Sequence, residues 1–243
     1  MTVRLDQLLV TRGLVSSRAR ARAAIEAGGV TVNGAAATTA SQKTAEDAVL
    51  TVREAHDWVG RGALKLAHAL ELWPVAVEGR TVLDVGASTG GFTEVCLRAG
   101  AARVYAVDVG RGQLHPAVAD DRRVVNLEGT DARDLTADTI PQAPHLIVCD
   151  ASFIGLAKVL PAALGLGAPG ADLVTLVKPQ FEMDSRSEVG RKGVVRDAAA
   201  RQAALDRVAA WLETSGWRVQ ATTESPIVGG DGNREWLLWA RRA

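Results

Sequence analysis

The sequence contains little cysteine and histidine, and neither residue occurs in a spacing that binds metal. The two cysteines, Cys96 and Cys149, stand alone without C-x-x-C spacing, and the four histidines show no ligand pattern. Disulfide frameworks and structural zinc sites both depend on such spacings. We therefore expect neither a disulfide bond nor a bound metal ion.

Long apolar runs are also absent. No stretch approaches eighteen consecutive apolar residues, and the opening MTVRLDQLLVTRG lacks the apolar core and small-residue cleavage site of a signal peptide. A helix that spans a bilayer needs about twenty predominantly apolar residues. We therefore expect a cytoplasmic protein with no membrane partner.

The chain has no net charge, because basic and acidic residues are balanced at 28 each. Any nucleic-acid surface must therefore be local. The first 22 residues hold one acid, Asp6, and a basic excess made of Arg4, Arg12, Arg18, Arg20 and Arg22. A solvated helix face is the simpler interpretation of this run. However, Arg18 and Arg22 are one helical turn apart, where like charges repel, and a bound anion would relieve that cost.

The opening segment predicts a small unit of two helices and short strands. Apolar residues recur at helical spacing in LDQLLVTRG, and a second helix in SSRARARAAIEAGG can begin at Ser16 or Ser17 and end at Gly28 or Gly29. VTVNG predicts a strand followed by a tight turn, and AVLTVRE predicts another strand. The residues between them, 35–47, are small and polar.

After this unit the pattern changes to alternating strands and helices. The predicted strands are residues 81–85, 103–107, 124–127, 145–149, 171–177, 217–222 and 235–240. Helical segments separate most of them, and RGALKLAHALEL predicts one more helix before the first strand. Such alternation predicts a mostly parallel sheet covered on both faces. Only SPIVGGDGNR separates the last two strands, which predicts a hairpin and one antiparallel strand at the end of the order.

A cluster of small residues follows the first strand of this α/β domain, in TVLDVGASTGGFTEV. Gly86, Gly90 and Gly91 would let the backbone approach a ligand closely, and the helix from Phe92 offers its N-terminal amides. The spacing D-x-G-x-S-x-G-G differs from the G-x-G-x-x-G of nicotinamide enzymes and lacks the lysine of a phosphate-binding loop. The segment therefore predicts a ligand that does not require a pyrophosphate site.

Acidic residues follow the first three strands. Asp108 ends the second strand, where a carboxylate can accept both ribose hydroxyls of a nucleoside. Asp131 follows the third strand, where it can meet the exocyclic amine of an adenine. A single loop aspartate is more often a helix cap than a ligand, but Asp84, Asp108 and Asp131 on consecutive strand ends favour a ligand. An adenosine-containing cofactor without a pyrophosphate indicates S-adenosylmethionine.

Charged residues also follow the next two strands. Asp150 in VCDASF ends the fourth strand, and Lys178 in LVTLVKPQFE ends the fifth, with Pro179 stiffening the exit. A lysine in this position must either reach water or pair with Asp150. Lys65 in RGALKL and Glu235 in GNREWLLW would by themselves be interpreted as surface charges.

These motifs resemble known families. GRGALKL, LDVGASTGGFTE, VCDASF, VKPQFE and GNREW resemble the FtsJ-type ribose methyltransferases, which share a Lys-Asp-Lys-Glu tetrad. The N-terminal RLDQLLVTRGLVSSRARARAAIEAGGVTVNG resembles the S4 RNA-binding domain. In this order, and over essentially the entire chain, they resemble the TlyA family of ribosomal-RNA 2′-O-methyltransferases, often labelled hemolysins.

The resemblance implies an S4-like domain over residues 1–56, a linker over 57–60 and a methyltransferase domain over 61–243. The implied fold is α/β, with a Rossmann-like seven-stranded S-adenosylmethionine methyltransferase sheet that has one antiparallel strand, preceded by a small α+β S4 domain. The implied cofactor is S-adenosylmethionine, and the implied partner is ribosomal RNA or a ribosomal subunit. The implied reaction is 2′-O-methylation of ribose, on cytidine, and the oligomeric state stays open.

The resemblance also implies roles for single residues. The catalytic tetrad becomes Lys65, Asp150, Lys178 and Glu235. The cofactor contacts become Asp84, Gly86, Ala87, Ser88, Gly90, Gly91, Phe92, Asp108, Val109, Asp131, Ala132 and Asp150. The RNA contacts become Arg4, Arg12, Arg18, Arg20, Arg22 and Arg61. The segment HDWVGRGALKL becomes the hinge between the domains, with Trp58 near its centre.

Two departures from the family pattern and three alternative functions remain. The loop EMDSRSEVGRKGVV carries a few extra residues, and Gly230 stands where the family has proline. A methyltransferase that acts on an RNA base or on a small molecule is one alternative, although DASF is not the N-P-P-Y or D-P-P-Y typical of base-amine enzymes. A non-catalytic RNA-binding or ribosome-assembly protein is the second. A membrane-acting hemolysin is the third, and the absence of an apolar span disfavours it.

Overall fold

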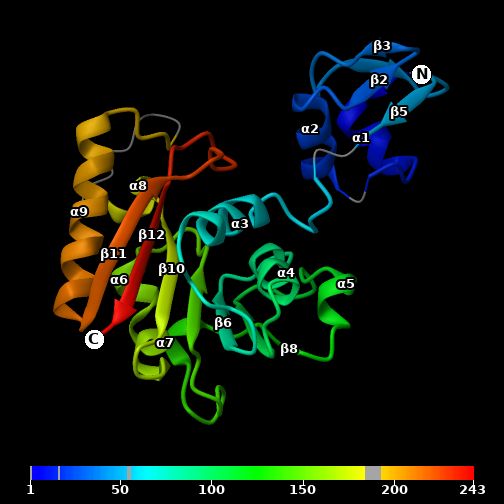
Figure 1. The fold of residues 1–243 in the computed structure, drawn as a ribbon. Helices are drawn as coiled ribbons and strands as arrows, with labels where there is room; N and C mark the ends of the chain where they lie inside the picture. The colour runs from blue at the N-terminus through cyan, green and yellow to red at the C-terminus, as the bar shows by residue number, and fades with distance from the viewer. Residues whose placement is uncertain (1, 16, 54–55, 184–192) are drawn as a thin grey trace. The chain divides into compact units, whose positions relative to one another are not determined.

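The computed structural model describes residues 2–15, 17–53, 56–183 and 193–243 (Figure 1). The chain divides into two compact units, residues 1–61 and residues 62–243. The segment expected to form the linker, 57–60, groups with the first unit, where Arg20 Nη1 donates a hydrogen bond to the backbone oxygen of Trp58 at 2.9 Å. Ser16 and residues 184–192 of the loop that departs from the family pattern lie outside the described residues.

The first unit packs two helices against short antiparallel strands. Its elements in chain order are β1 (Thr2–Arg4), α1 (Leu5–Thr11), α2 (Arg18–Glu26), β2 (Val30–Val32), β3 (Ala35–Ala36), β4 (Lys43–Ala45) and β5 (Leu50–Val52). β1 pairs with β4, and β3, β2 and β5 form a three-stranded sheet. Its core contains Leu5, Leu9 and Ile25, all of which are buried.

Local signals set the ends of these elements. The Ser17 side chain caps α2 by accepting a hydrogen bond from the backbone of Arg20 at 3.2 Å, and Gly28, with φ of +69°, follows the end of the helix. Asn33 and Gly34 both have positive φ and join β2 to β3 in a two-residue hairpin loop, as predicted. The strands β3 and β4 were not predicted, because short strands of small, polar residues carry no apolar alternation.

The second unit contains a seven-stranded sheet in the order β11-β12-β10-β9-β6-β7-β8. The strands are β6 (Thr81–Val85), β7 (Arg103–Asp108), β8 (Val124–Glu128), β9 (Leu146–Cys149), β10 (Asp172–Val177), β11 (Trp217–Glu224) and β12 (Trp236–Arg242). All seven predicted strands are present and differ from the observed ones only at their ends. β12 is the antiparallel strand, and although it is last in the chain it lies between β10 and β11.

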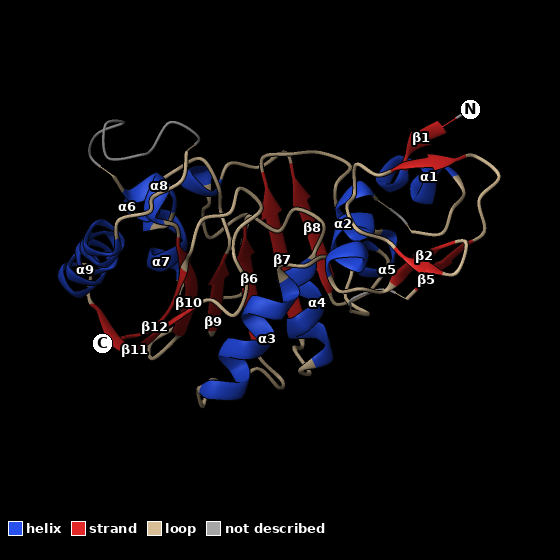
Figure 2. Cartoon of the chain, turned by 90° about the horizontal axis from the view of Figure 1, so that it is seen from above, coloured by secondary structure: helices blue, strands red, loops and turns tan. Residues whose placement is uncertain are grey.

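Helices cover both faces of this sheet. They are α3 (Ala63–Leu72), α4 (Gly91–Arg98), α5 (Pro116–Ala119), η1 (Ala132–Asp134), α6 (Leu156–Val159), α7 (Pro161–Leu166), α8 (Pro179–Glu182) and α9 (Ala198–Thr214). Figure 2 shows α3 and α4 on one face and α6, α7 and α9 on the other. The central strands β9 and β10 are buried along their whole length, as expected for parallel strands covered on both faces.

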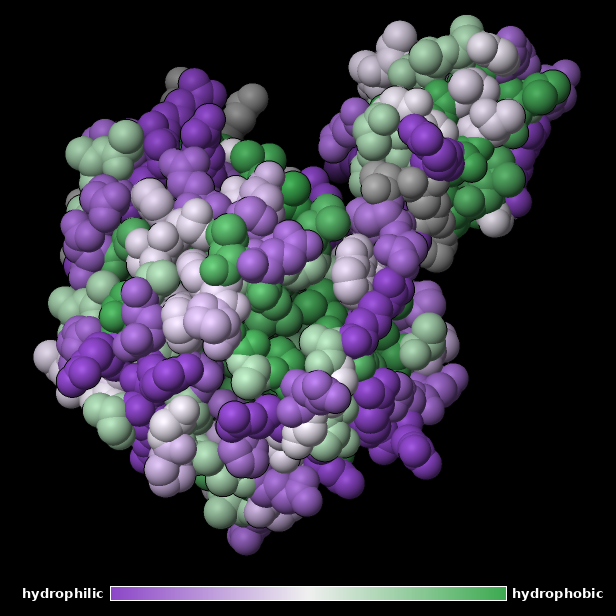
Figure 3. All heavy atoms as spheres, in the orientation of Figure 1, coloured by the Kyte–Doolittle hydropathy of each residue, from purple (hydrophilic) through white to green (hydrophobic). Residues whose placement is uncertain are grey.

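Hydrophobic side chains gather toward the middle of the face of the second unit seen in Figure 3, and its rim is mostly hydrophilic. Within the described ranges, no helix is both long enough and apolar enough to cross a membrane. The strands β6, β7, β8, β9 and β10 run parallel to one another, so their carboxyl ends meet at one edge of the sheet. Ligands of open α/β sheets bind at this edge.

Candidate active site

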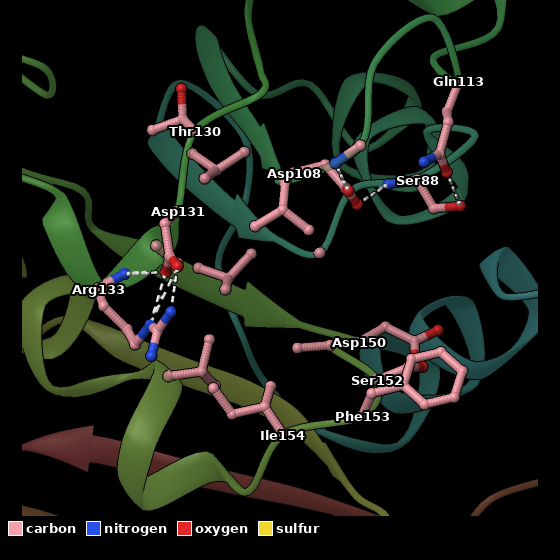
Figure 4. A pocket seen from close by; sticks show the side chains of 18 residues that line it. Ser88, Asp108, Gln113, Thr130, Asp131, Arg133, Asp150, Ser152, Phe153 and Ile154 are labelled. Carbon is pink, nitrogen blue, oxygen red and sulfur yellow. Dashed lines mark hydrogen bonds and ion pairs between the residues drawn. The ribbon is translucent and has the colours of Figure 1, made fainter.

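A cavity of about 500 Å³ opens at the carboxyl ends of β6, β7 and β9 (Figure 4). This volume lies in the range of about 300–1,000 Å³ that is usual for small-molecule sites. Seven of the predicted cofactor residues line the cavity: Gly86, Ser88, Asp108, Val109, Asp131, Ala132 and Asp150. The other five, Asp84, Ala87, Gly90, Gly91 and Phe92, do not line it.

Asp84 lies beneath the turn that follows β6 and is completely buried. One of its carboxylate oxygens accepts a hydrogen bond from Thr93 Oγ1 at 2.6 Å, which ties β6 to the first turn of α4. Its other oxygen, Oδ1, is buried without a hydrogen-bond partner among the described residues. Burial raises the pKa of Asp84 to about 7, against the opposing effect of the Thr93 hydrogen bond. This aspartate therefore supports the turn from below.

The glycines of this turn make room for other parts of the protein. Gly86 has a φ of +82°, and a Cβ atom there would lie 2.9 Å from the backbone of Ala151. Gly90 has a φ of +91°, and a Cβ atom there would lie 2.8 Å from a methyl group of Leu114. The nearest atoms at both positions belong to other segments of the protein, and Gly86 also lines the cavity. The turn after β6 is therefore shaped by contacts with the segments after β9 and β7. The close approach of a ligand to these glycines stays a prediction.

Asp108 organises the cofactor side of the cavity. Its Oδ2 atom accepts a hydrogen bond from the backbone N–H of Ser88 at 2.8 Å, and its Oδ1 atom accepts one from Gly110 at 2.7 Å. A carboxylate has about four acceptor positions, so Asp108 can still accept hydrogen bonds from a ligand. Asp131 caps η1 and forms an ion pair with Arg133 at 2.5 Å, which lowers the pKa of Asp131 to about 2. Its main partner is therefore a neighbouring side chain.

The four residues of the expected tetrad come together at this edge of the sheet. Lys178 Nζ lies 2.6 Å from Asp150 Oδ1, and Lys65 Nζ lies 3.9 Å from Asp150 Oδ2. Lys65 Nζ also lies 2.6 Å from Glu235 Oε2. The result is a chain of alternating charges, Lys178–Asp150–Lys65–Glu235. Lys65, Lys178 and Glu235 are buried, and buried charges of this kind are stable only when paired.

Fold topology explains how residues so far apart in sequence meet. Asp150 and Lys178 follow the parallel strands β9 and β10 directly. Because β12 is antiparallel, its first residue, Trp236, pairs with Val177 at the end of β10. Glu235 is thereby placed beside the strand exits, and Lys65 reaches them from the first turn of α3. A parallel β12 would place Glu235 at the opposite edge.

The loop before Glu235 is held by close contacts. A Cβ atom at Gly229 would lie 2.6 Å from Glu235 Oε1. Asn233 is buried, accepts a hydrogen bond from the backbone of Val195 at 2.9 Å and donates one to Gly193 at 2.9 Å. At Gly230, where the resemblance led us to expect proline, a Cβ atom would meet nothing within 4 Å. The glycine at this position therefore does not disturb Glu235.

Several residues of the cavity wall were not predicted: Gln113, Thr130, Arg133, Ser152, Phe153 and Ile154. Phe153 is the most unusual of them, since its φ is +68° and its side chain is 91% exposed. Its ring centroid lies 5.4 Å from that of Phe181. Strained, exposed residues cluster at functional sites, but φ cannot be read from VCDASF. The one available signal was a large apolar residue three positions after a strand-end aspartate.

The arginines of the first unit gather around one buried acid. Asp6 is completely buried and forms ion pairs with Arg4 at 3.0 Å, Arg18 at 2.8 Å and Arg22 at 3.7 Å. The guanidinium groups of Arg4 and Arg18 hold the pKa of Asp6 well below its usual range. We expected a bound anion to relieve the Arg18–Arg22 repulsion, and the fold itself already supplies one carboxylate, Asp6, to both arginines. The single carboxylate of Asp6 balances only one of the three guanidinium charges, so the surface around it stays positive.

The other two arginines of this segment contact the backbone. Arg12 donates hydrogen bonds to the backbone oxygens of Ala48, at 2.6 Å, and Glu46. Arg20 donates to Trp58. Arg61 is the last residue of the first unit. The arginine cluster that remains for a partner is therefore Arg4, Arg18 and Arg22, whose side chains are 37%, 54% and 55% exposed.

The seven-stranded sheet with one antiparallel strand, and the cavity at its carboxyl edge, define the class of this protein as a methyltransferase. The FtsJ-like methyltransferase family matches residues 58–242, and the S4 domain family matches residues 3–50. The 16S/23S rRNA (cytidine-2′-O)-methyltransferase TlyA of Mycobacterium tuberculosis is 47% identical over 240 residues, which cover 98% of this chain and 89% of that protein. Hemolysin A of Brachyspira hyodysenteriae is 36% identical over 97% of this chain and 98% of its own length.

A solved structure from Streptococcus thermophilus, which carries a provisional hemolysin name, is 36% identical, with a TM-score of 0.80 over 100% of this chain and 89% of that one. The chain therefore belongs to the TlyA family of FtsJ-like methyltransferases that carry an N-terminal S4 domain.

Proposed function

We propose that the protein transfers a methyl group from S-adenosylmethionine to the 2′-hydroxyl of a cytidine in ribosomal RNA. Membership of the TlyA family and the activity of the Mycobacterium tuberculosis relative support this proposal. The single observation that carries it is the ion-pair chain Lys178–Asp150–Lys65–Glu235 at the rim of the cavity. A substrate hydroxyl needs an acid–base group, which the ion-pair chain provides, and the cofactor needs a cavity beside that group.

The cavity suits an adenosine-containing cofactor. Asp108 retains acceptor positions for ribose hydroxyls, and the turn at Gly86 and Ser88 forms the neighbouring wall. S-adenosylmethionine, when bound, supplies an electrophilic methyl group on a sulfonium centre. Asp131, which Arg133 holds in place, would face the adenine amine from the next strand end. Asp150 lies on the cavity wall and in the tetrad, and so joins the two parts of the site.

The tetrad residues have distinct roles in this proposal. A ribose hydroxyl is a weak nucleophile, so its orientation and the removal of its proton are a large part of the catalysis. Lys178 orients the hydroxyl and accepts its proton. Asp150 holds Lys178 at 2.6 Å, and Glu235 holds Lys65 beside the other oxygen of Asp150. Lys65 and Glu235 thereby set the position and charge state of the Asp150–Lys178 pair.

The first unit supplies the affinity for RNA. The S4 domain family covers residues 3–50, and the arginine cluster Arg4, Arg18 and Arg22 lies in that range. The 2′-hydroxyl occurs in RNA and not in DNA, so an RNA-binding domain and a ribose methyltransferase domain serve one reaction. Because its substrate is ribosomal RNA, we place the protein in the cytoplasm.

The test is to map the product. Purified protein is incubated with labelled S-adenosylmethionine and either intact ribosomal subunits or naked 16S and 23S rRNA, and the labelled nucleotide is identified. We expect a 2′-O-methylcytidine whose formation requires Lys178. A methyl group on a base, or no transfer to any RNA, would contradict the proposal.

A further inference from the structure

Three oxygen atoms surround the amine of Lys178. Its Nζ atom lies 2.6 Å from Asp150 Oδ1, donates to the backbone oxygen of Asp150 at 3.1 Å and donates to Ser152 Oγ at 2.8 Å. Two of these oxygens accept hydrogen bonds from Lys178, whereas the contact with Asp150 Oδ1 is an ion pair without hydrogen-bond geometry. A lysine ammonium has three donors and no acceptor. In this state Lys178 cannot take a proton from a substrate.

The three acceptors differ in what they can do once Lys178 is neutral. The carboxylate and carbonyl oxygens of Asp150 can only accept hydrogen bonds, so neither can supply a proton to the amine. A serine hydroxyl both donates and accepts. Ser152 can therefore turn its O–H toward the Nζ lone pair. Of these three partners, Ser152 is the one through which a proton can pass to Lys178.

The position of Ser152 fits this role. Ser152 lies on the wall of the cavity beside Asp150 and Phe153 (Figure 4). Ser152 is exposed, whereas only 8% of the Lys178 side chain is exposed. A substrate hydroxyl that enters the cavity can therefore reach the hydroxyl of Ser152 more easily than the buried amine. Ser152 is outside the tetrad, and no sequence motif singled it out.

We propose, resting on the proposed function, that Ser152 relays the proton of the ribose 2′-hydroxyl to Lys178. The 2′-oxygen forms a bond to the methyl carbon while the carbon–sulfur bond breaks and its electron pair stays on sulfur. Lys178 enters the step as the neutral amine, after one of its protons has passed to solvent. The 2′-hydroxyl proton then moves to Ser152 Oγ, and the Ser152 proton moves to Nζ of Lys178. The positive charge that leaves the sulfonium thus ends on the Lys178 ammonium, beside Asp150.

Single-turnover methylation of the RNA that the wild type modifies tests the relay, at saturating protein and cofactor. The variants are Ser152→Ala, which removes the hydroxyl, and Ser152→Thr, which keeps it. Ser215→Ala is the matched control, because it removes a hydroxyl that bonds to the backbone of Trp211 at 2.8 Å, in the turn after α9. We expect Ser152→Ala to lower the rate by at least about 10-fold. The loss should not exceed the 10²- to 10⁴-fold that a general base contributes. Ser152→Thr should keep most of the rate, and binding of S-adenosylhomocysteine should stay at the wild-type value.

The solvent isotope effect separates a relay from simple positioning of Lys178. If two protons move, the wild-type rate depends on the deuterium fraction of the solvent along a curve, and in Ser152→Ala the dependence becomes linear. A wild-type rate for Ser152→Ala, or a linear dependence in the wild type, would overturn the relay. If the wild type itself methylates no RNA, it is the proposed function that fails, so the two failures are distinct.

Discussion

At the scale of single residues, the site depends on charges that the protein places away from water. Lys65, Lys178 and Glu235 are buried, and each lies 2.6 Å from a group of opposite charge. Asp84 is also buried, but within the described part of the chain its hydrogen bonds come from Thr93 and it forms no ion pair. Burial therefore has opposite consequences at neighbouring positions, ion pairing in one place and proton uptake in the other.

Lys178→Ala should separate binding from chemistry. We expect S-adenosylhomocysteine binding near the wild-type value and a fall of about 10²- to 10⁴-fold in the single-turnover rate, because a proton-transfer group is lost. Lys178→Arg should not restore the rate, since a guanidinium stays protonated at any working pH. Lys158→Ala, an exposed lysine on α6, is the control. Near-normal turnover of Lys178→Ala would show that another group accepts the proton.

Asp84 should make the stability of the second unit depend on pH. Its pKa rises from 3.8 to about 7 on folding, so between these values the folded protein holds a proton that the unfolded chain has lost. The free energy of unfolding should therefore fall as pH rises from about 4 to 7, by up to about 4 kcal/mol, and level off above that. Asp84→Asn should remove most of this slope.

Urea unfolding followed by tryptophan fluorescence, at pH 5 and pH 7.5 without cofactor, measures the effect. Most of the tryptophans lie in the second unit. Asp138→Asn is the control, because Asp138 is exposed. Equal pH dependence in Asp84→Asn and the wild type would mean that Asp84 is ionised in the folded protein.

At the scale of elements, turns and strand directions bring the site together. The turn after β6 packs between the segments that follow β9 and β7. Gly86 and Gly90 are required there because protein atoms occupy the space that a side chain would need. The direction of β12 places Glu235 at the cofactor edge. The turn after β6 and the direction of β12 each position a whole element. A change in either would therefore displace several functional groups together.

Gly90→Ala tests the packing of this turn. An alanine at φ of +91° costs about 1 kcal/mol for the backbone conformation alone, and overlap with Leu114 at 2.8 Å adds about 1–3 kcal/mol. Gly170→Ala is the matched control, since Gly170 has a φ of +69° and open space around its Cβ position. We expect Gly90→Ala to lower the free energy of unfolding clearly more than Gly170→Ala. Equal losses would mean that Leu114 moves aside without cost.

At the scale of the whole molecule, charge is divided unevenly although the total is zero. The first unit carries the arginine cluster Arg4, Arg18 and Arg22 around the single carboxylate of Asp6. The second unit holds its site charges in matched pairs. RNA affinity should therefore reside largely in the first unit and chemistry in the second.

Neutralising Arg18, Arg20 and Arg22 to glutamine should weaken RNA binding and flatten its salt dependence. If each arginine contacts a phosphate, the slope of log affinity against log salt should fall by up to about three units. Because Arg20 already bonds to Trp58, the pair Arg18→Gln and Arg22→Gln should account for most of the change. Arg218→Gln, at an exposed arginine on β11, is the control. An unchanged slope would place the RNA surface elsewhere.

The sequence by itself determined most elements of this protein, because strand alternation, capping residues and the Asn33–Gly34 turn are local properties of the chain. It also determined which residue types stand at the strand ends, and the resemblance grouped Lys65 and Glu235 with the residues that follow β9 and β10. What those side chains contact was decided by the tertiary structure. The buried Asp6 under its arginines, the protein atoms against Gly86 and Gly90, and the third partner of Lys178 all join segments that are separate in sequence. Such contacts depend on how distant elements pack, and no local pattern records that.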